Sequence, residues 1–302
     1  MEHIERTSSI TTLTLGLLIA AVTTAAISMI AHTQLHLVSQ TMRVISLILS
    51  ALALLKVANS VAPALHRIIR TPIHWIHALF FEWLTLIFVI PLLQVLRLHK
   101  KYEAPLGSLS GKPILLVHGY CKNSSVWFYL RKQLAKENLG PIYTINLGSR
   151  YQSIREYAKA VEKKCAQIRL ETGHPELVLI GHSMGGLVSA LCAFQSEYIT
   201  DVITIASPMA GTHLAKIGIG PNAREMKLGS LLTTELTKAI SLESRVRFYH
   251  IGTKTDHLVV PNRSALPGTH PTREFHFEDI GHASLLLSPR VATLLTHWLK
   301  TN

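Results

Sequence analysis

Residues Val178–Leu187 have the sequence VLIGHSMGGL, in which Gly-x-Ser-x-Gly interrupts an apolar run and a helix-like pattern follows. This order predicts a strand, a sharp turn and a helix. Gly181 and Gly185 permit a backbone too crowded for side chains, so the turn presents Ser183 Oγ at the tip of the strand. The Met184 N–H at the start of the helix points to the same place, with the helix dipole behind it. The pattern predicts Ser183 as a nucleophile.

Strands and helices alternate after a polar linker at Glu103–Lys112. We expect strands at Pro113–Val117, Ile142–Leu147, Leu177–Ile180, Val202–Ala206, Val246–Ile251 and Arg273–Phe277, and helices at Ser124–Glu137, Ser153–Leu170, Met184–Gln195 and Ala283–Lys300, the first capped by Ser124 or Ser125. Such alternation implies an α/β fold with a mostly parallel sheet and helices on both faces. Ligands of such sheets bind beyond the carboxyl ends of the strands. Residues 209–244 interrupt the alternation and form either a cap or lid over that edge or a plain surface excursion.

Three hydrophobic stretches precede the linker. Ile10–Ile30 contains no charged residue and is long enough to span a bilayer, which takes about 20 apolar residues. Val44–Ala62 contains one charged residue. Trp75–Leu96 contains Glu82, which is costly in lipid unless it is paired, so this stretch is either a third span or a buried or interfacial helix. We expect a membrane anchor with two or three transmembrane helices at residues 1–101 and a catalytic domain at residues 102–302.

The net charge of +12 raises the question of a nucleic-acid partner. The positive residues are dispersed, only 7% of residues are aromatic, and no motif that recognises bases is present, so no nucleic-acid partner is expected. Attraction to an anionic membrane is the simpler explanation of the charge. With three spans the flanking positive residues balance, whereas with two spans they favour a cytoplasmic catalytic domain. The expectation is a multi-pass protein of a bacterial inner membrane, with membrane lipids as partners and no obligate protein partner.

A serine hydroxyl needs a neutral imidazole to take its proton. His282 is the best placed histidine, because it lies between the last expected strand and the final helix. The imidazole in turn needs a carboxylate that fixes its tautomer. Asp256 follows an expected strand and gives the chain order serine, acid, base, whereas the rival acid Asp279 would have to fold back sharply to reach His282.

Attack on an ester builds negative charge on the carbonyl oxygen, which needs fixed N–H donors. We expect these donors to be the N–H groups of Met184 and of Tyr120, the latter in the loop after the first strand. No cofactor is implied. The histidine pairs His32/His36 and His74/His77 lack a third ligand at a fitting position, so no metal is expected.

The chain from about Lys112 to Asn302 resembles the lipase and esterase branch of the α/β-hydrolases, especially small bacterial triacylglycerol lipases. The segments that carry this resemblance are Val117–Tyr120, Gly181–Gly186, Ala206–Thr212, Asp256–Pro261 and Gly281-His282, with Arg224–Leu232 also similar to a segment of the cap region. The resemblance implies the α/β-hydrolase fold and a Ser/His/Asp acyl-enzyme mechanism on carboxylic esters without a catalytic metal.

The chain departs from the pattern at two places. Cys121 stands near a position where many relatives have glycine, and Met209-Ala210 replaces a polar pair. Neither change touches Ser183, Asp256 or His282. The leading hypothesis is a membrane-anchored serine esterase or lipase acting on ester or lipid substrates. The alternatives are an acyltransferase that uses the same three residues and a catalytically silent membrane scaffold with a hydrolase fold.

Overall fold

The computed structural model describes residues 73–95, 104–268 and 273–301. By its contacts the chain divides into two compact units, Met1–Arg70 and Thr71–Asn302. The first unit, which contains the expected spans Ile10–Ile30 and Val44–Ala62, lies outside the described residues.

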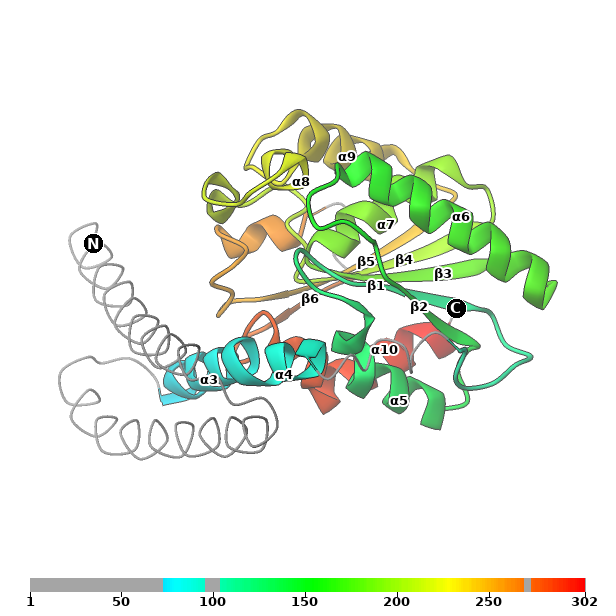
Figure 1. The fold of residues 1–302 in the computed structure, drawn as a ribbon, viewed down its shortest axis with the longest axis horizontal. Coiled ribbons are helices and arrows are strands. Elements are labelled where there is room, and N and C mark those ends of the chain that lie inside the picture. Colours follow the sequence, from blue (N-terminus) through cyan, green and yellow to red (C-terminus); the bar gives the residue numbers. More distant parts are fainter. Residues whose placement is uncertain (1–72, 96–103, 269–272, 302) are drawn as a thin grey trace, which may run out of the picture. The chain divides into compact units, whose positions relative to one another are not determined.

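The second unit is built on a parallel sheet of six strands in the order β2-β1-β3-β4-β5-β6 (Figure 1). The strands are β1 (Ile114–Val117), β2 (Ile142–Ile145), β3 (Leu177–His182), β4 (Ile199–Ile205), β5 (Arg247–Thr253) and β6 (Glu274–Phe277). All six fall on the expected strands within a few residues. The prediction of an α/β fold with a parallel sheet is confirmed.

Helices cover both faces of this sheet (Figure 1). On one face lie α6 (Ile154–Thr172), α7 (Met184–Gln195) and α9 (Leu231–Leu242), whose apolar side chains share a core with Leu115 and Val117 of β1. On the other lie α5 (Phe128–Lys136) and α10 (Pro289–Lys300), which share a core with Ile114 and Leu116. Successive side chains of a strand point to opposite faces, so one short apolar strand supplies both cores.

Two expected helices differ in detail from the structure. The first begins as a short 3-10 segment, Ser124–Trp127, and its cap is Asn123, whose side chain accepts a hydrogen bond from the Ser125 N–H. The expected cap at Ser124 or Ser125 is therefore wrong by one or two residues. The closing helix expected at 283–300 is divided into a 3-10 segment, η7 (Ser284–Leu287), and α10. The division follows from Pro289, which lacks an N–H and suits the first turn of a new helix capped by Ser288.

Residues 209–244 contain the 3-10 segment η4 (His213–Lys216), α8 (Pro221–Glu225) and α9. Ser230 caps α9 and accepts a hydrogen bond from the Thr233 N–H. Thr212 Oγ1 donates to the Leu258 carbonyl at 2.8 Å, so the start of this segment is bound to the loop after β5.

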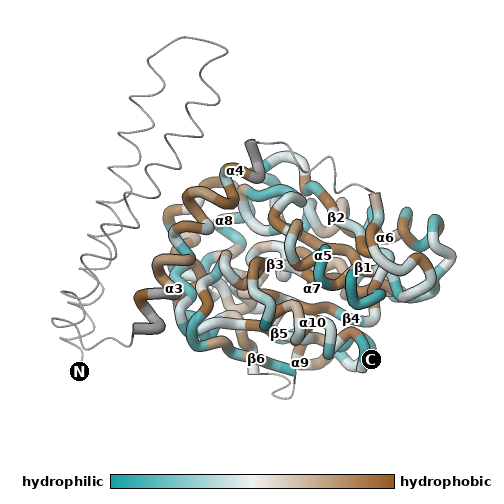
Figure 2. Tube along the Cα trace, turned by 90° about the horizontal axis from the view of Figure 1, so that it is seen from below, coloured by the Kyte–Doolittle hydropathy of each residue, from teal (hydrophilic) through white to brown (hydrophobic). Residues whose placement is uncertain are grey.

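The third hydrophobic stretch forms α3 (Ile73–Leu84), a π-helical turn at Thr85–Val89, and α4 (Ile90–Val95). Its residues are strongly apolar (Figure 2), but Glu82 is buried and Ile90 belongs to the core that α5 and α10 share with the sheet. The compact unit therefore begins at Thr71 and includes this helix, whereas the sequence placed the domain boundary between residues 101 and 102. Within residues 73–95, 104–268 and 273–301, no helix combines the length and the apolar character that crossing a bilayer requires.

Candidate active site

Ser183 lies at the sharp turn between β3 and α7. Its backbone has φ 56° and ψ −127°, a conformation that side-chain-bearing residues rarely adopt, and its N–H donates to the Ile205 carbonyl at 2.9 Å. The turn requires glycine on both sides of the serine. A Cβ on Gly181 would lie 2.4 Å from the Gly185 carbonyl oxygen, and a Cβ on Gly185 would lie 2.2 Å from the Val117 carbonyl oxygen.

The structure brings Asp256 and His282 together. Asp256 follows β5, and its Oδ2 accepts a hydrogen bond from His282 Nδ1 at 2.8 Å. Its other oxygen, Oδ1, accepts from the N–H groups of Leu258 and Val259, each at 2.8 Å. The carboxylate is thus held by its own loop, and its remaining oxygen is aimed at the imidazole. Both side chains are buried, with residue exposures of 6% for Asp256 and 2% for His282.

Burial alone would lower the pKa of His282, because it disfavours the charged ring. The negative charge of Asp256 and its hydrogen bond to the ring act in the opposite direction and prevail, so the pKa lies above the ordinary value of 6.5. Asp256 therefore stabilises the imidazolium form of His282 and fixes a proton on Nδ1. Nε2 is left as the nitrogen that accepts a proton.

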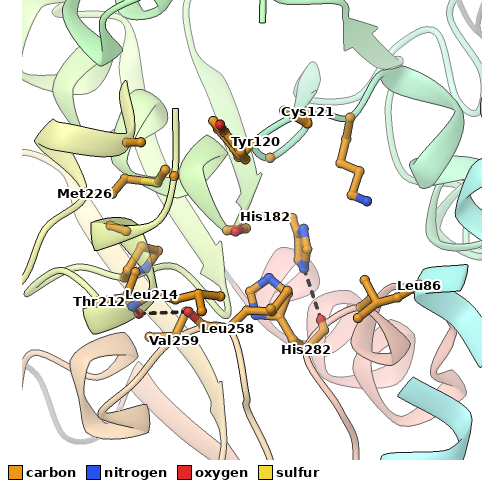
Figure 3. Close-up of a pocket in the computed structure, with 18 of the residues that line it drawn as sticks. Leu86, Tyr120, Cys121, His182, Thr212, Leu214, Met226, Leu258, Val259 and His282 are labelled. Carbon is orange, nitrogen blue, oxygen red and sulfur yellow. Dashed lines mark hydrogen bonds between the residues drawn. The ribbon is translucent and has the colours of Figure 1, made fainter. Parts of the chain in front are cut away.

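Ser183 and His282 line one cavity of about 410 Å³. Figure 3 shows His282 among the side chains of its wall. Ser183 follows β3, Asp256 follows β5 and His282 follows β6, so all three lie at the carboxyl edge of the sheet. The rival acid Asp279 is instead paired with Arg290 at 2.8 Å on the surface.

The loop after β1 passes directly over Ser183. A Cβ on Gly119 would lie 2.9 Å from Ser183 Cβ, so only glycine permits this approach. His118 holds the loop from below: its Nδ1–H donates to the Gly119 carbonyl at 2.9 Å, and its Nε2 accepts from the Leu147 N–H at 3.1 Å. Tyr120 lies next in this loop and lines the cavity. Met184 is the first residue of α7, so its N–H has no partner within the helix.

His182, which sequence reasoning did not single out, is the last residue of β3 and contacts the loop that carries His282. Burial holds its pKa well below the ordinary value, so the ring is neutral. Its Nε2–H donates to the His282 carbonyl at 3.1 Å, and the two rings meet edge to face with centroids 4.7 Å apart (Figure 3). The sequence feature that could have indicated a role for His182 is its position directly before Ser183 in the Gly-x-Ser-x-Gly motif.

Most of the cavity wall is apolar. Residues of the 209–244 segment form one side, among them Leu214, Ile217 and Met226. Leu86 of the π-helical turn and Ile90 of α4 also line the cavity. The Tyr120 hydroxyl donates to the Ile219 carbonyl at 2.9 Å and accepts from the Ile219 N–H at 3.0 Å, which binds the two sides of the rim together. The segment therefore covers the site, as a cap would.

Within the described part of the chain, no group of three or more His, Cys, Asp or Glu side chains is arranged to hold a metal ion. The side chains of the pairs His32/His36 and His74/His77 lie outside the described residues.

Residues 112–229 match the family described as alpha/beta hydrolase fold. No curated protein matches the chain. Among solved structures it is similar to Aspergillus fumigatus lipase B, with TM-score 0.56 and 15% identity over 64% of this chain and 54% of that one. The mature lipase BlEst2 of Bacillus licheniformis gives TM-score 0.54 and 15% identity over 65% and 95% of the two chains. A monoacylglycerol lipase of Paleococcus ferrophilus gives TM-score 0.50 and 18% identity, over 66% of this chain and 98% of that one.

The match spans about half of the Aspergillus fumigatus chain but nearly all of the other two. At these identities the likeness is one of fold. Together with the parallel sheet and the turn at Ser183, the comparisons identify the chain as carrying a domain of the α/β-hydrolase fold.

Proposed function

We propose that this protein is a serine hydrolase that cleaves carboxylic esters through an acyl-enzyme intermediate. The observation that carries the proposal is the Asp256–His282 hydrogen bond of 2.8 Å, in a cavity that both His282 and the sharply turned Ser183 line. A carboxylate, an imidazole and a serine in these roles form the combination that activates a hydroxyl for attack on a carbonyl.

In the proposed reaction, Ser183 Oγ attacks the ester carbonyl while His282 Nε2 takes the hydroxyl proton. The N–H groups of Tyr120 and Met184 stabilise the negative oxygen of the tetrahedral intermediate. The intermediate collapses, the ester C–O bond breaks, and His282 gives its proton to the leaving alcohol. Water then attacks the acyl-enzyme with His282 again as base, which releases the acid and restores Ser183.

The apolar wall of the cavity supports an acyl chain as the group that it holds. Structural relatives that are named as lipases, one of them a monoacylglycerol lipase, support the same substrate class. Ester or lipid substrates with an apolar acyl chain are therefore the proposed class.

A membrane location is part of the proposal and rests on the hydropathy of Ile10–Ile30 and Val44–Ala62. Because the helix that contains Glu82 packs in the hydrolase unit, two spans remain. With two spans the flanking residues Arg67, Arg70, Arg97, Lys100 and Lys101 outnumber Arg43, which favours a cytoplasmic catalytic domain.

The test is hydrolysis by the purified full chain in detergent, measured on p-nitrophenyl esters of increasing acyl length. Turnover that is lost in Ser183→Ala, with an unchanged melting profile, supports the proposal. Equal turnover in Ser183→Ala overturns it. Product analysis in the presence of an added alcohol separates hydrolysis, which gives the free acid, from acyl transfer, which gives a new ester.

A further inference from the structure

A second buried carboxylate lies beside the candidate base, and it comes from the N-terminal helix. Glu82 of α3 is only 2% exposed. The Ala283 N–H donates to its two oxygens at 2.8 and 2.9 Å, and the N–H and Oγ–H groups of Ser284 each donate to Oε2 at 3.0 Å. Ala283 and Ser284 directly follow His282. Ala283 is the N-cap of the 3-10 segment η7, and Ser284 is its first residue.

The contact extends to the residue before His282. A Cβ on Gly281 would lie 2.3 Å from Glu82 Oε2 and 2.6 Å from Glu82 Cβ, so the loop is shaped to admit this side chain. Thr85, one turn along the helix, places its hydroxyl 3.5 Å from Ser284 Oγ. Glu82 therefore contacts the chain on both sides of His282.

A buried carboxylate is costly unless it is well hydrogen-bonded or paired. Among the residues that the structure describes, Glu82 forms no ion pair with lysine or arginine, and its hydrogen bonds come from Ala283 and Ser284. An apolar residue at this position would satisfy the core packing of α3 alone. The carboxylate instead holds the two N–H groups at the start of η7.

We propose that Glu82 is a positioning residue that fixes the loop of His282 and thereby the candidate base itself. The inference rests on the proposed function, since it assigns a second support to the same base. Asp256 orients the imidazole through Nδ1, His182 binds the His282 carbonyl, and Glu82 binds the backbone that follows.

The charge of Glu82 also acts on His282. The charged and titratable groups that face this ring are Asp256 from the loop after β5, Glu82 from α3, Lys122 from the loop after β1 and His182 from β3. Glu82 raises the pKa of His282, and Lys122 lowers it. Loss of the Glu82 charge therefore lowers the pKa of the base.

The test compares Glu82→Gln and Glu82→Ala in the full chain, with Glu137→Gln as the matched control. Glu137 is an exposed carboxylate at the carboxyl end of α5, where it is paired with Lys300 at 2.8 Å. Glutamine keeps an acceptor for the N–H groups but removes the charge, and alanine removes both. The readouts are kcat and KM on a soluble ester, the pH profile of kcat/KM and the melting temperature.

Glu82→Ala is expected to lower kcat about tenfold or more, since the loop of His282 loses the hydrogen bonds that hold the base in position. KM is expected to stay near the wild-type value, because Glu82 does not line the cavity. Glu82→Gln is expected to keep more of kcat and to move the acid limb of the profile to lower pH. Glu137→Gln is expected to change neither kcat nor the acid limb of the pH profile.

A Glu82→Gln protein that keeps the wild-type kcat and the wild-type acid limb would overturn the inference, and this variant decides the question even when Glu82→Ala does not fold. A loss of kcat matched by an equal loss of folded protein would also overturn it. Failure of the proposed function is distinguishable, because in that case wild type and Ser183→Ala hydrolyse the ester equally.

Discussion

At the scale of single residues, backbone groups hold the three candidate catalytic side chains in place. Ser183 depends on a backbone conformation that β3 and α7 impose on it, and Asp256 is fixed by the N–H groups of Leu258 and Val259. His282 receives Asp256 on its ring and His182 on its carbonyl. Such support aligns the groups before a substrate arrives. This prior alignment is the source of most of the catalytic effect of a preorganised site.

Asp256→Asn is expected to lower kcat about 10⁴-fold, because an amide leaves the imidazole in the wrong tautomer and does not stabilise its charge. The acid limb of any residual activity is expected to lie at lower pH than in wild type, because Asp256 raises the pKa of His282. Steady-state kinetics across pH check both points. The matched control is Asp279→Asn, which removes the rival acid from its surface pair with Arg290 and is expected to retain wild-type activity. Equal losses in the two variants would contradict the assignment.

The motif residues could be proposed from the sequence because local patterns specify them. The Gly-x-Ser-x-Gly motif predicts the turn at Ser183. Asp256 and His282 could be proposed because each follows an expected strand, in the chain order serine, acid, base. Glu82 was conspicuous as a carboxylate in an apolar stretch, but its partners lie about 200 positions away in the chain, as the separation of 201 between Glu82 and Ala283 shows. No local pattern predicts a pairing at that distance.

At the scale of elements, the rim of the cavity joins two segments that are far apart in the chain. Tyr120, in the loop after β1, both donates to and accepts from the backbone of Ile219. One residue thus supplies a backbone N–H to the proposed oxyanion site and a hydroxyl to the cap. The sequence suggested the first role alone.

Tyr120→Phe is expected to loosen the cap while the backbone N–H remains. Losing two exposed hydrogen bonds costs about 1 kcal/mol, so KM for long-chain esters is expected to rise about fivefold, with little change in kcat on a short ester. Hydrogen exchange of a peptide that covers residues 213–221 is expected to become faster. The control is Tyr151→Phe, whose ring lies 6.5 Å from that of Tyr120. Unchanged exchange in Tyr120→Phe would show that the two hydrogen bonds do not hold the cap.

Element boundaries show where sequence patterns stop being informative. The alternation of apolar runs predicted all six strands, whereas the closing helix was expected to be continuous across Ser288 and Pro289. The N-terminal helix is the larger difference. Its hydropathy suits lipid and protein interiors equally. The hydrogen bonds of Glu82 and the burial of Ile90 in the core of α5 and α10 identify the second compact unit as its neighbour.

At the scale of the whole molecule, buried neutral histidines link stability to pH. Burial lowers the pKa of His118 to about 4 from 6.5. Between these values the unfolded chain binds the proton and the folded chain does not, so the stability contribution is complete above pH 6.5 and is lost as the pH falls toward about 4. The difference between the two pKa values of His118 corresponds to about 3 kcal/mol in the free energy of unfolding. The lowered pKa of His182 acts in the same direction.

The free energy of unfolding is therefore expected to fall less steeply with acidification in His118→Gln than in wild type. Denaturant titrations at a series of pH values between neutrality and about pH 4 measure the slope. His297→Gln, a change at an exposed histidine of α10, serves as the control and is expected to follow the wild-type slope. An identical slope in all three proteins would contradict the burial argument.

The two compact units lead to a prediction about truncation. A chain that begins at Thr71 retains every residue that lines the cavity, so its turnover of a short soluble ester is expected to match that of the full chain. A chain that begins at residue 104 lacks Glu82, Leu86 and Ile90 and is expected to lose activity.

Sedimentation with anionic vesicles is expected for the full chain and not for the chain from Thr71, because the two apolar stretches lie before that residue. Equal sedimentation of both would contradict the proposed membrane role of those stretches.

The most direct test of the central claim is covalent labelling with a fluorophosphonate, which reacts with an activated serine. Purified full-length protein in detergent is incubated with the probe at a pH above the pKa of His282, beside Ser183→Ala. The account predicts labelling of wild type at Ser183, identified by peptide mass, and none in the variant. Labelling that persists in Ser183→Ala, or folded wild-type protein that does not react, would contradict the claim that His282 and Asp256 activate Ser183.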